Sequence, residues 1–125
     1  MKNLPNEIPV FPLSNFIIFP NTSVPLNIFE PRYIDMINDS MRSEKLIGMI
    51  QPNNSLDSEN LIPKLHKVGC LGKITSFKDM ENGNFLIELK GLIRFTILEE
   101  VKTKKKYRTF KVNFDNFKND LEVRQ

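Results

Sequence analysis

Alternating apolar and polar residues fill most of the second half of this chain and commit it to β-structure. Apolar side chains recur at every second position within residues 66–77, 85–101 and 110–114, which is the period of a half-buried strand. Asn82-Gly83 separates the first two stretches, and this dipeptide is the strongest short-range signal for a tight hairpin. A strand over 85–101 would be improbably long, so we expect Gly91 to interrupt it with a bulge or sharp bend. The inward set of the first stretch is expected to be Val68, Cys70, Gly72 and Ile74.

The first half carries prolines where strands are expected and one stretch with helical spacing. Residues 8–13 and 24–29 are short apolar segments, and because proline cannot donate to a ladder we expect them at the rim of a sheet. Pro31 suits the first turn of a helix, and the apolar spacing after it predicts a helix over about 31–43. The apolar residues 46–50 predict a buried strand, and the polar, turn-forming residues 52–64 predict a long mobile loop.

These elements add up to about seven short strands and one early helix. One helix cannot cover a sheet of that size, so the sheet must cover itself by curling into a partly closed barrel. The expected fold class is mainly β (α+β), a curled sheet or pseudo-barrel of about six to seven strands with one early helix. No internal repeat or domain boundary interrupts the sequence, so residues 1–125 are expected to form a single domain with 115–125 as its tail.

A single cysteine limits the chemistry and the compartment. Cys70 is the only one, so the chain can form no intrachain disulfide and no thiolate metal cluster. It lies in an alternating apolar stretch, which predicts a buried and unreactive thiol. No apolar run approaches the roughly 20 residues of a membrane span, and prolines interrupt the N-terminal apolar residues, unlike the core of a signal peptide. These features favour the cytoplasm, with no membrane partner.

Residues that could carry chemistry are scattered. His66 is the only histidine, no serine lies in a Gly-x-Ser-x-Gly motif, and the glycines form no phosphate-binding loop. His66 and Cys70 would lie roughly 13 Å apart on one strand face, too far to share a metal ion. Glu99 and Glu100 point to opposite faces of a strand, unlike a converging glycosidase pair. The sequence therefore predicts no enzyme activity, with no catalytic, cofactor-binding or metal-binding residues and no cofactor.

Positive charge is concentrated late in the chain. Residues 1–65 carry 5 basic and 7 acidic side chains, whereas 66–125 carry 13 basic and 8 acidic ones. Much of the excess falls in residues 102–108, which we expect to be a solvated hairpin tip. A basic run attracts phosphate backbones, so RNA binding through 102–111 stays an alternative. Only Tyr107 and Phe110 are present there as stacking aromatics, and nucleic acid is therefore not the expected partner.

Four large apolar residues followed by a proline stand together near the N-terminus. On an extended segment they cannot all point inward, so one or two are expected at the surface, in an irregular loop suited to peptide contact. Met80, beside the expected hairpin turn, is a second candidate, because methionine adapts its shape to many partners. The competing interpretation makes Phe16 and Phe19 core plugs and Ile17 a harmless exposed residue. The candidate peptide-binding residues are Phe16, Ile17, Ile18, Phe19, Pro20 and Met80.

Between about residues 8 and 101 the chain carries, in order, IPVFPLSNFIIFPNTSVPLNIFEPRYIDMI, LIGMI, VGCLGKITSF and NGNFLIELKGLIRFTILEEV. Together these segments resemble the Lon substrate-binding (Lon N-terminal) domain, and they are most similar to small bacterial proteins that carry this domain without the protease. The most specific pieces are residues 29–33 (FEPRY) and 68–70 (VGC). The resemblance implies a PUA-like pseudo-barrel with an early inserted helix. Because family members usually continue into a helical segment, residues 115–125 are expected to be the start of one.

In Lon proteases this domain precedes an AAA+ ATPase and a Ser–Lys protease, and it helps to capture damaged or tagged proteins. The present sequence has no Walker motif and no catalytic Ser–Lys pair, so the resemblance implies binding alone. The expected function is that of a non-catalytic module that binds unfolded or degron-bearing polypeptides, with a protease or chaperone system as a partner. Besides RNA binding, a purely structural adaptor role stays open, because a related domain serves as an adaptor in the ubiquitin ligase receptor cereblon.

Overall fold

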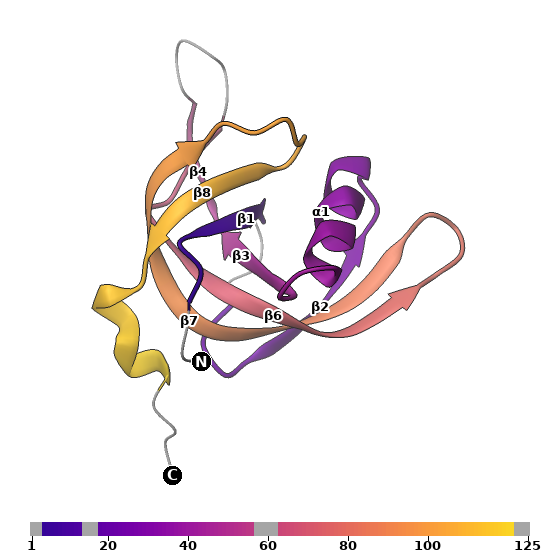
Figure 1. Ribbon diagram of the computed structural model, residues 1–125, viewed down its shortest axis with the longest axis horizontal. Coiled ribbons are helices and arrows are strands. Elements are labelled where there is room, and N and C mark those ends of the chain that lie inside the picture. The colour runs from indigo at the N-terminus through magenta and orange to yellow at the C-terminus, as the bar shows by residue number, and fades with distance from the viewer. Residues whose placement is uncertain (1–3, 14–17, 57–62, 122–125) are drawn as a thin grey trace.

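The computed structural model describes residues 4–13, 18–56 and 63–121 of the 125-residue chain, with only the backbone for 53–56 and 63–64 (Figure 1). Eight strands, one α-helix and one 3-10 helix follow one another along it. In chain order they are β1 Glu7–Pro12, β2 Ser23–Ile28, α1 Pro31–Met41, β3 Leu46–Ile50, β4 Pro52–Leu56, β5 Pro63–Leu65, β6 Val68–Asp79, β7 Phe85–Val101, β8 Arg108–Asn113 and η1 Asp115–Leu121.

The main sheet closes on itself. Its six strands follow the order β2-β7-β6-β3-β1-β8, and β8 pairs in turn with β7. Five strands therefore form a ring, to which β2 adds an outer strand along the first part of β7. All pairings are antiparallel except that of β1 with β3. The predicted fold class, a mainly β chain that curls into a barrel with one early helix, is confirmed.

The strand β7 closes the barrel because it is long enough to pair with two sets of partners. Residues 85–90 pair with β2 and residues 96–101 with β8, while β6 follows β7 over most of its length. The strand runs unbroken through 17 residues, so the expectation that it would be too long is wrong. The expected bulge at Gly91 is confirmed: Leu71 pairs with Ile93 and Gly72 with Gly91, which leaves Leu92 as an extra residue. A bulge bends a strand and increases its twist, which lets β7 follow the curve of the barrel.

The β6–β7 hairpin turns at the predicted place but through a longer connection. Residues 80–84 join the two strands, and the amide of Met80 donates to the carbonyl of Asn84 at 3.0 Å. Gly83 has a φ of 90° and Glu81 a φ of 65°. Asn82-Gly83 predicted a tight turn. The connection instead has five residues, and its positive φ angles occur at Glu81 and Gly83.

The strand β1 lies inside the sheet, between β3 and β8, although its prolines predicted a rim position. Pro9 pairs only with β8, because the parallel ladder to β3 begins one residue later, at Val10. Pro12 is the last residue of the strand. Both prolines thus fall at the limits of the ladder to β3, which is where a sheet tolerates them. The other proline-bearing strand, β2, pairs only with β7 in the described part of the chain and is an edge strand, as predicted.

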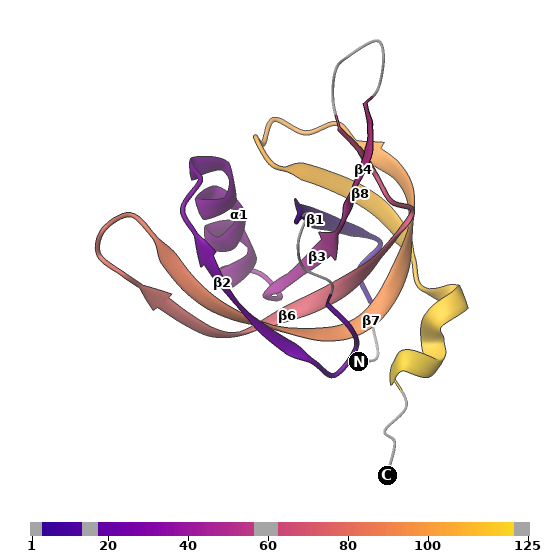
Figure 2. The same ribbon diagram turned by 180° about the vertical axis from the view of Figure 1, so that it is seen from behind.

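The polar stretch 52–64 contains two strands where a plain loop was expected. β4 and β5 pair antiparallel as a small second sheet, with Pro52 opposite Leu65 and Leu56 opposite Pro63. Residues 57–62, between these strands, lie outside the described residues. The pair of strands projects from one end of the barrel (Figures 1 and 2).

The helix α1 covers the concave side of the sheet, and η1 lies on the opposite side of the barrel (Figures 1 and 2). Pro31 starts α1 as predicted, and the helix ends at Met41, two residues before the expected end. One core cluster lies under this helix and includes Ile28, Tyr33, Met36, Ile37, Phe85, Ile87 and Leu89. A second cluster fills the barrel and includes Ile8, Val10, Leu71, Ile93, Phe95 and Phe110. In the described residues, no helix is long and apolar enough to cross a membrane.

Candidate functional site

The structure separates the candidate residues near the N-terminus by exposure. Phe16 and Ile17 lie outside the described residues. Ile18 is buried, whereas 56% of Phe19 is exposed. The interpretation of Phe19 as a core plug is therefore wrong, and the expectation that part of this apolar run reaches the surface is confirmed at Phe19.

A tight turn of four residues holds Phe19 in place. The amide of Thr22 donates to the carbonyl of Phe19 at 3.1 Å, and the Thr22 hydroxyl donates to the same carbonyl at 2.7 Å. Pro20 is the second residue of the turn, and Asn21, with a φ of 67°, is the third. Proline followed by a residue of positive φ is the pattern of a type II β-turn. Local sequence therefore fixes the backbone of Phe19 without burying its ring.

The turn docks on β7 at Gly91. The Gly91 amide donates to the Thr22 carbonyl and the Asn21 amide donates to the Gly91 carbonyl, both at 2.8 Å. A Cβ atom at position 91 would lie 2.2 Å from the Phe19 carbonyl oxygen. Only glycine allows two backbones to approach this closely. The residue that carries the bulge of β7 therefore also positions the turn.

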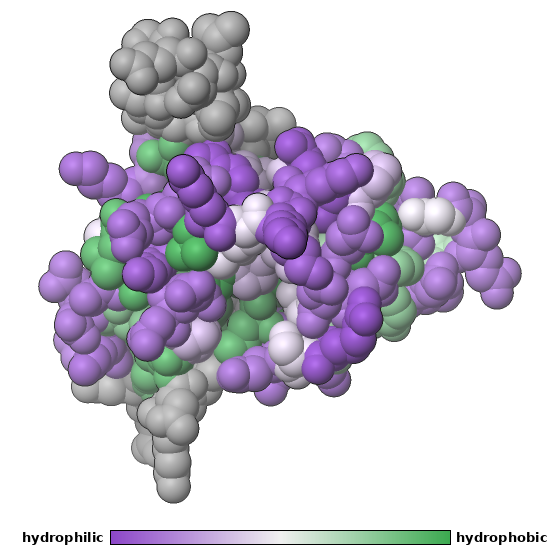
Figure 3. All heavy atoms as spheres, turned by 45° about the horizontal axis from the view of Figure 1, so that its top comes forward, coloured by the Kyte–Doolittle hydropathy of each residue, from purple (hydrophilic) through white to green (hydrophobic). Residues whose placement is uncertain are grey.

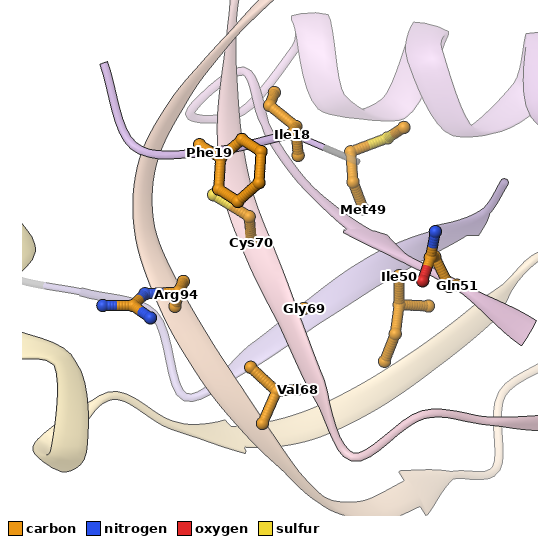
Figure 4. Close-up of a pocket in the computed structure, with 9 residues that line it drawn as sticks. All are labelled: Ile18, Phe19, Met49, Ile50, Gln51, Val68, Gly69, Cys70 and Arg94. Carbon is orange, nitrogen blue, oxygen red and sulfur yellow. The ribbon is translucent and has the colours of Figure 1, made fainter. Parts of the chain in front are cut away.

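Beside the turn lies a small, mostly apolar hollow of about 120 Å³, which we name the Phe19 pocket. In Figure 4 Arg94 lies on one flank of this pocket, with Met49 and Gln51 on the other and Phe19 in front of Cys70. The segment 18–19, the end of β3, the start of β6 and one residue of β7 supply its walls. They are lined by Ile18, Phe19, Met49, Ile50, Gln51, Val68, Gly69, Cys70 and Arg94.

Cys70 contributes a neutral thiol to this pocket. It is 3% exposed, and burial raises the pKa of the thiol to about 12. Its Sγ donates to the carbonyl of Leu71 at 3.6 Å. A thiol that stays protonated is neither a nucleophile nor a ready metal ligand. Across residues 4–13, 18–56 and 63–121, no three His, Cys, Asp or Glu side chains lie close enough to hold a metal ion.

Arg94 forms a flank of the pocket with its charge already paired. Its Nη2 lies 2.9 Å from Asp120 Oδ1 and its Nε 3.0 Å from Asp120 Oδ2, the geometry of two parallel hydrogen bonds. The guanidinium carbon also lies 4.8 Å from the centre of the Phe117 ring. These contacts tie η1 to β7. Because the charge of Arg94 is already paired with Asp120, apolar contact is the main interaction that the pocket offers to a ligand.

Val68 is 45% exposed, so its expected place in the inward set is wrong. Val68 pairs with Thr96, and Cys70 pairs with Arg94, which places these four side chains on the outer face of the barrel. Phe95, which lies between Arg94 and Thr96 on β7, is fully buried in the barrel. Cys70 is buried on the outer face, where Ile18 and Phe19 lie beside it in the pocket.

Met80 belongs to a different surface. It is 40% exposed, as is Leu86, and Phe29 is 62% exposed. The registers of β2 and β6 against β7 make Leu86 a diagonal neighbour of both Phe29 and Met80, on the face of β7 opposite to Phe85 and Ile87, and we name these three residues the hairpin-tip surface. Ten residues of β6 and its turn separate Cys70 from Met80, which corresponds to roughly 33 Å of extended chain. The candidate residues thus lie on two surfaces.

Figure 3 shows one face of the molecule, on which hydrophobic side chains reach the surface as patches between hydrophilic ones.

The basic run forms the β7–β8 connection and is only partly a solvated tip. Lys102, Lys104 and Lys106 are exposed as predicted, but Tyr107 is buried. The Tyr107 hydroxyl donates to Asp39 Oδ2 of α1 at 2.6 Å, and Lys105 Nζ lies 3.2 Å from the same oxygen. The hydrogen bond from Tyr107 holds the pKa of Asp39 below its ordinary value, and burial raises the pKa of Tyr107.

Burial also removes the aromatics that RNA binding would need. Tyr107 is 9% exposed and Phe110 5%. A base can stack only on a ring face that solvent reaches. The exposed lysines alone would provide a phosphate contact without a stacking platform.

Comparison with known proteins places the chain among Lon sequences. Residues 7–124 match the family model described as the ATP-dependent protease La (LON) substrate-binding domain. The chain is 32% identical over 108 residues to the Lon protease of Flavobacterium johnsoniae, covering 86% of this chain and 13% of that protein. It is 28% identical over 100 residues to the Lon protease of Anaeromyxobacter dehalogenans, covering 80% of this chain and 12% of that protein. The chain thus spans only about an eighth of the length of these relatives.

Solved structures agree on the fold. The crystal structure of a Lon N-terminal domain protein from Xanthomonas campestris superposes with a TM-score of 0.70 at 21% identity, covering 86% of this chain and 59% of that one. The N-terminal domain of Mycobacterium avium complex Lon protease gives a TM-score of 0.66 at 16% identity, covering 86% and 54%. The resemblance seen in the sequence is confirmed, and the chain belongs to the Lon substrate-binding domain family.

Proposed function

We propose that this domain binds extended segments of unfolded or tagged polypeptide and performs no chemistry on them. The observation that carries the proposal is Phe19, an exposed aromatic ring held by its own turn beside an apolar pocket. Together the ring and the apolar lining form a contiguous apolar patch, and such patches mark interaction sites more often than single exposed side chains do. The family description, a substrate-binding domain, supports the same function.

The size and lining of the Phe19 pocket suit one apolar side chain. Its volume of about 120 Å³ is a little below the roughly 150 Å³ of an apolar cavity that holds one benzene molecule, so it has room for one apolar side chain of about the size of leucine. Phe19, Met49 and Val68 can accept side chains of different shapes, because apolar contact is not directional and methionine is flexible. Such a pocket would recognise unfolded chains by their exposed apolar residues, with little sequence preference.

A single pocket of this kind binds weakly, so further contacts are needed. Burying one leucine side chain contributes about 1.5–3 kcal/mol, and ordering a flexible peptide costs a similar amount. We place Met80 with Phe29 and Leu86 as a second contact, which would raise the affinity of a chain long enough to reach both surfaces. Phe16 and Ile17, which precede the Phe19 turn in sequence, stay candidates for the same contact.

We infer that the bound polypeptide is passed to a protease or chaperone system in the cytoplasm. The relatives that support this are named Lon protease, and the matched region is a small part of each of them. In this arrangement the domain would select the polypeptide and other parts of the system would process it. No cofactor is required for binding by apolar contact.

Binding to a reduced, alkylated and therefore permanently unfolded protein tests the proposal. Phe19→Ser should weaken binding about tenfold, because most of the apolar contact at the pocket is lost. The free energy of unfolding should change by less than about 1 kcal/mol, because the ring is largely exposed. Affinity is measured by fluorescence anisotropy and stability by urea denaturation.

Leu121→Ser is the matched control. Leu121 is an apolar side chain at the end of η1, 36% exposed, and lines neither the Phe19 pocket nor the hairpin-tip surface. It should leave binding unchanged. Equal affinity of Phe19→Ser and the wild type for the unfolded protein would refute the assignment of the pocket.

A further inference from the structure

A second bulge in β7 turns Leu98 outward. Ile97 pairs with Val112 and Glu99 pairs with Lys111, so Leu98 is the extra residue between them. Leu98 is 59% exposed, more than Phe19. Bulges re-aim side chains and are frequent beside functional sites. The outward direction of Leu98 is therefore built into the backbone of the barrel.

Leu98 borders a hollow of about 590 Å³, which we name the Leu98 groove. Its apolar walls include Leu65 and Ile97, and its other lining residues include Lys67, His66 and Arg108. None of the described residues that line it carries a carboxylate. Arg108 is bound by Glu100 at 2.8 and 3.1 Å, whereas no carboxylate pairs with Lys67 in the described part of the chain. The groove therefore combines an apolar floor with a lysine, Lys67, that has no carboxylate partner within residues 4–13, 18–56 and 63–121.

The Leu98 groove lies next to the Phe19 pocket along β6 and β7. Lys67 of the groove directly precedes Val68 of the pocket, and Val68 pairs with Thr96, which also lines the groove. The Ile97 amide donates to the Lys67 carbonyl at 2.7 Å, which holds the two walls together. Four residues of β7 separate Arg94 from Leu98, which corresponds to roughly 13 Å of extended chain. An extended peptide in the pocket would reach the groove about four residues later.

We propose that the Leu98 groove is a second subsite for the same polypeptide, and that it selects an acidic residue next to an apolar one. This inference rests on the proposed function. The apolar side chain packs against Leu98 and Ile97, and the carboxylate pairs with Lys67. A basic residue at that position meets like charge from Lys67, whereas the charge of Arg108 is already paired with Glu100, so the groove adds a charge preference that the Phe19 pocket lacks.

Two labelled peptides of about ten residues test this inference. Each carries two leucines about four positions apart, with Asp beside the second leucine in one peptide and Lys in the other. The wild-type domain should bind the Asp peptide about five- to tenfold more tightly at low salt, the effect of one partly exposed ion pair against a like-charge contact. Lys67→Glu should remove or reverse this preference. Leu98→Ser should weaken both peptides.

Lys90→Glu is the matched control, because it makes the same charge change at an exposed position of β7 that lines neither hollow. It should keep the preference. Equal affinity of the wild type for both peptides, or a preference that survives Lys67→Glu, would overturn the subsite. Phe19→Ser separates the two proposals: it should weaken both peptides equally and keep their ratio. If neither peptide binds, or if Phe19→Ser has no effect on either, the proposed function itself fails.

Discussion

Gly91 has two tasks, because it holds the first bulge of β7 and receives the backbone of the Phe19 turn. In Gly91→Ala the new Cβ would lie 2.2 Å from the Phe19 carbonyl oxygen, so the turn must move away from β7. We expect a loss of about 1–3 kcal/mol in the free energy of unfolding, as for other overpacked sites. Binding of unfolded protein should weaken as well, because Phe19 moves with its turn.

Gly83→Ala is the control for this variant. A Cβ at Gly83 meets nothing within 4 Å, but its φ of 90° is strained for any other residue. It should cost about 1 kcal/mol in urea denaturation and leave the affinity for unfolded protein unchanged. If Gly91→Ala keeps full affinity, the docking of the turn on β7 does not position the site.

Both tyrosines of the chain, Tyr33 and Tyr107, have a pKa raised above the ordinary 10.0, in each case mainly by burial. Each therefore contributes stability that is present below the ordinary pKa and lost as the pH rises through the folded pKa. Since the chain has no tryptophan, the increase in near-ultraviolet absorbance that accompanies phenol ionisation reports these two tyrosines alone. The folded protein should titrate at a higher pH than the unfolded chain. A native midpoint near 10.0 would contradict the burial of both rings.

At the scale of elements, sequence periodicity predicts which segments are strands but not how much of a strand face is covered. The alternation in β6 predicted Val68 inside together with Cys70 and Ile74, yet only the latter two belong to the first core cluster, and Val68 lies beyond its cover. The apolar run at 16–20 and its turn residues predicted an exposed Phe19. The remaining pocket residues come from the ends of β3 and β6 and from the outer face of β7, and only pairing brings them together. Nothing local in Met49 or Arg94 signals that contact.

The length of β7 and the position of β1 escaped prediction for the same reason. A 17-residue strand is unusual, but here its two ends pair with different neighbours around a closed barrel. Pro9 indicated an edge strand, yet it lies one residue before the β3 ladder starts. Long-range pairing decides both cases. Local propensity carries no information about it.

The β7–β8 connection offers a prediction about how an element is held. Tyr107→Phe removes the hydrogen bond to Asp39 and should cost about 0.5–1.5 kcal/mol, whereas Lys104→Ser with Lys106→Ser should change stability by less than about 0.5 kcal/mol. Because the folded pKa of Asp39 is lowered, its stabilising effect is present above the ordinary value and lost as the pH falls through the lowered one. In Tyr107→Phe the pKa of Asp39, followed by NMR, should rise. An unchanged value would mean that Tyr107 does not hold this carboxylate.

At the scale of the whole molecule, a closed barrel provides a rigid frame for two outward-facing apolar hollows. The ring of β7, β6, β3, β1 and β8 buries its own interior, so the outer face of β6 and β7 is free to carry the Phe19 pocket. The Leu98 groove lies next to it, where Leu65, Ile97 and Phe110 of the barrel cluster form its apolar floor. Both hollows lie beside bulges of the same strand. The irregularities that let β7 close the barrel also shape the surface that we propose as the binding site.

The most direct test of this account is an NMR titration of the labelled domain with an unlabelled, permanently unfolded protein. The account predicts that amide signals shift first and most at Phe19–Thr22, Met49–Gln51 and Val68–Cys70, around the Phe19 pocket. Signals of α1 and of the barrel interior should stay in place, because binding moves no core element. Shifts confined to the hairpin-tip surface or to the exposed lysines of residues 102–106, with none at the pocket, would contradict it.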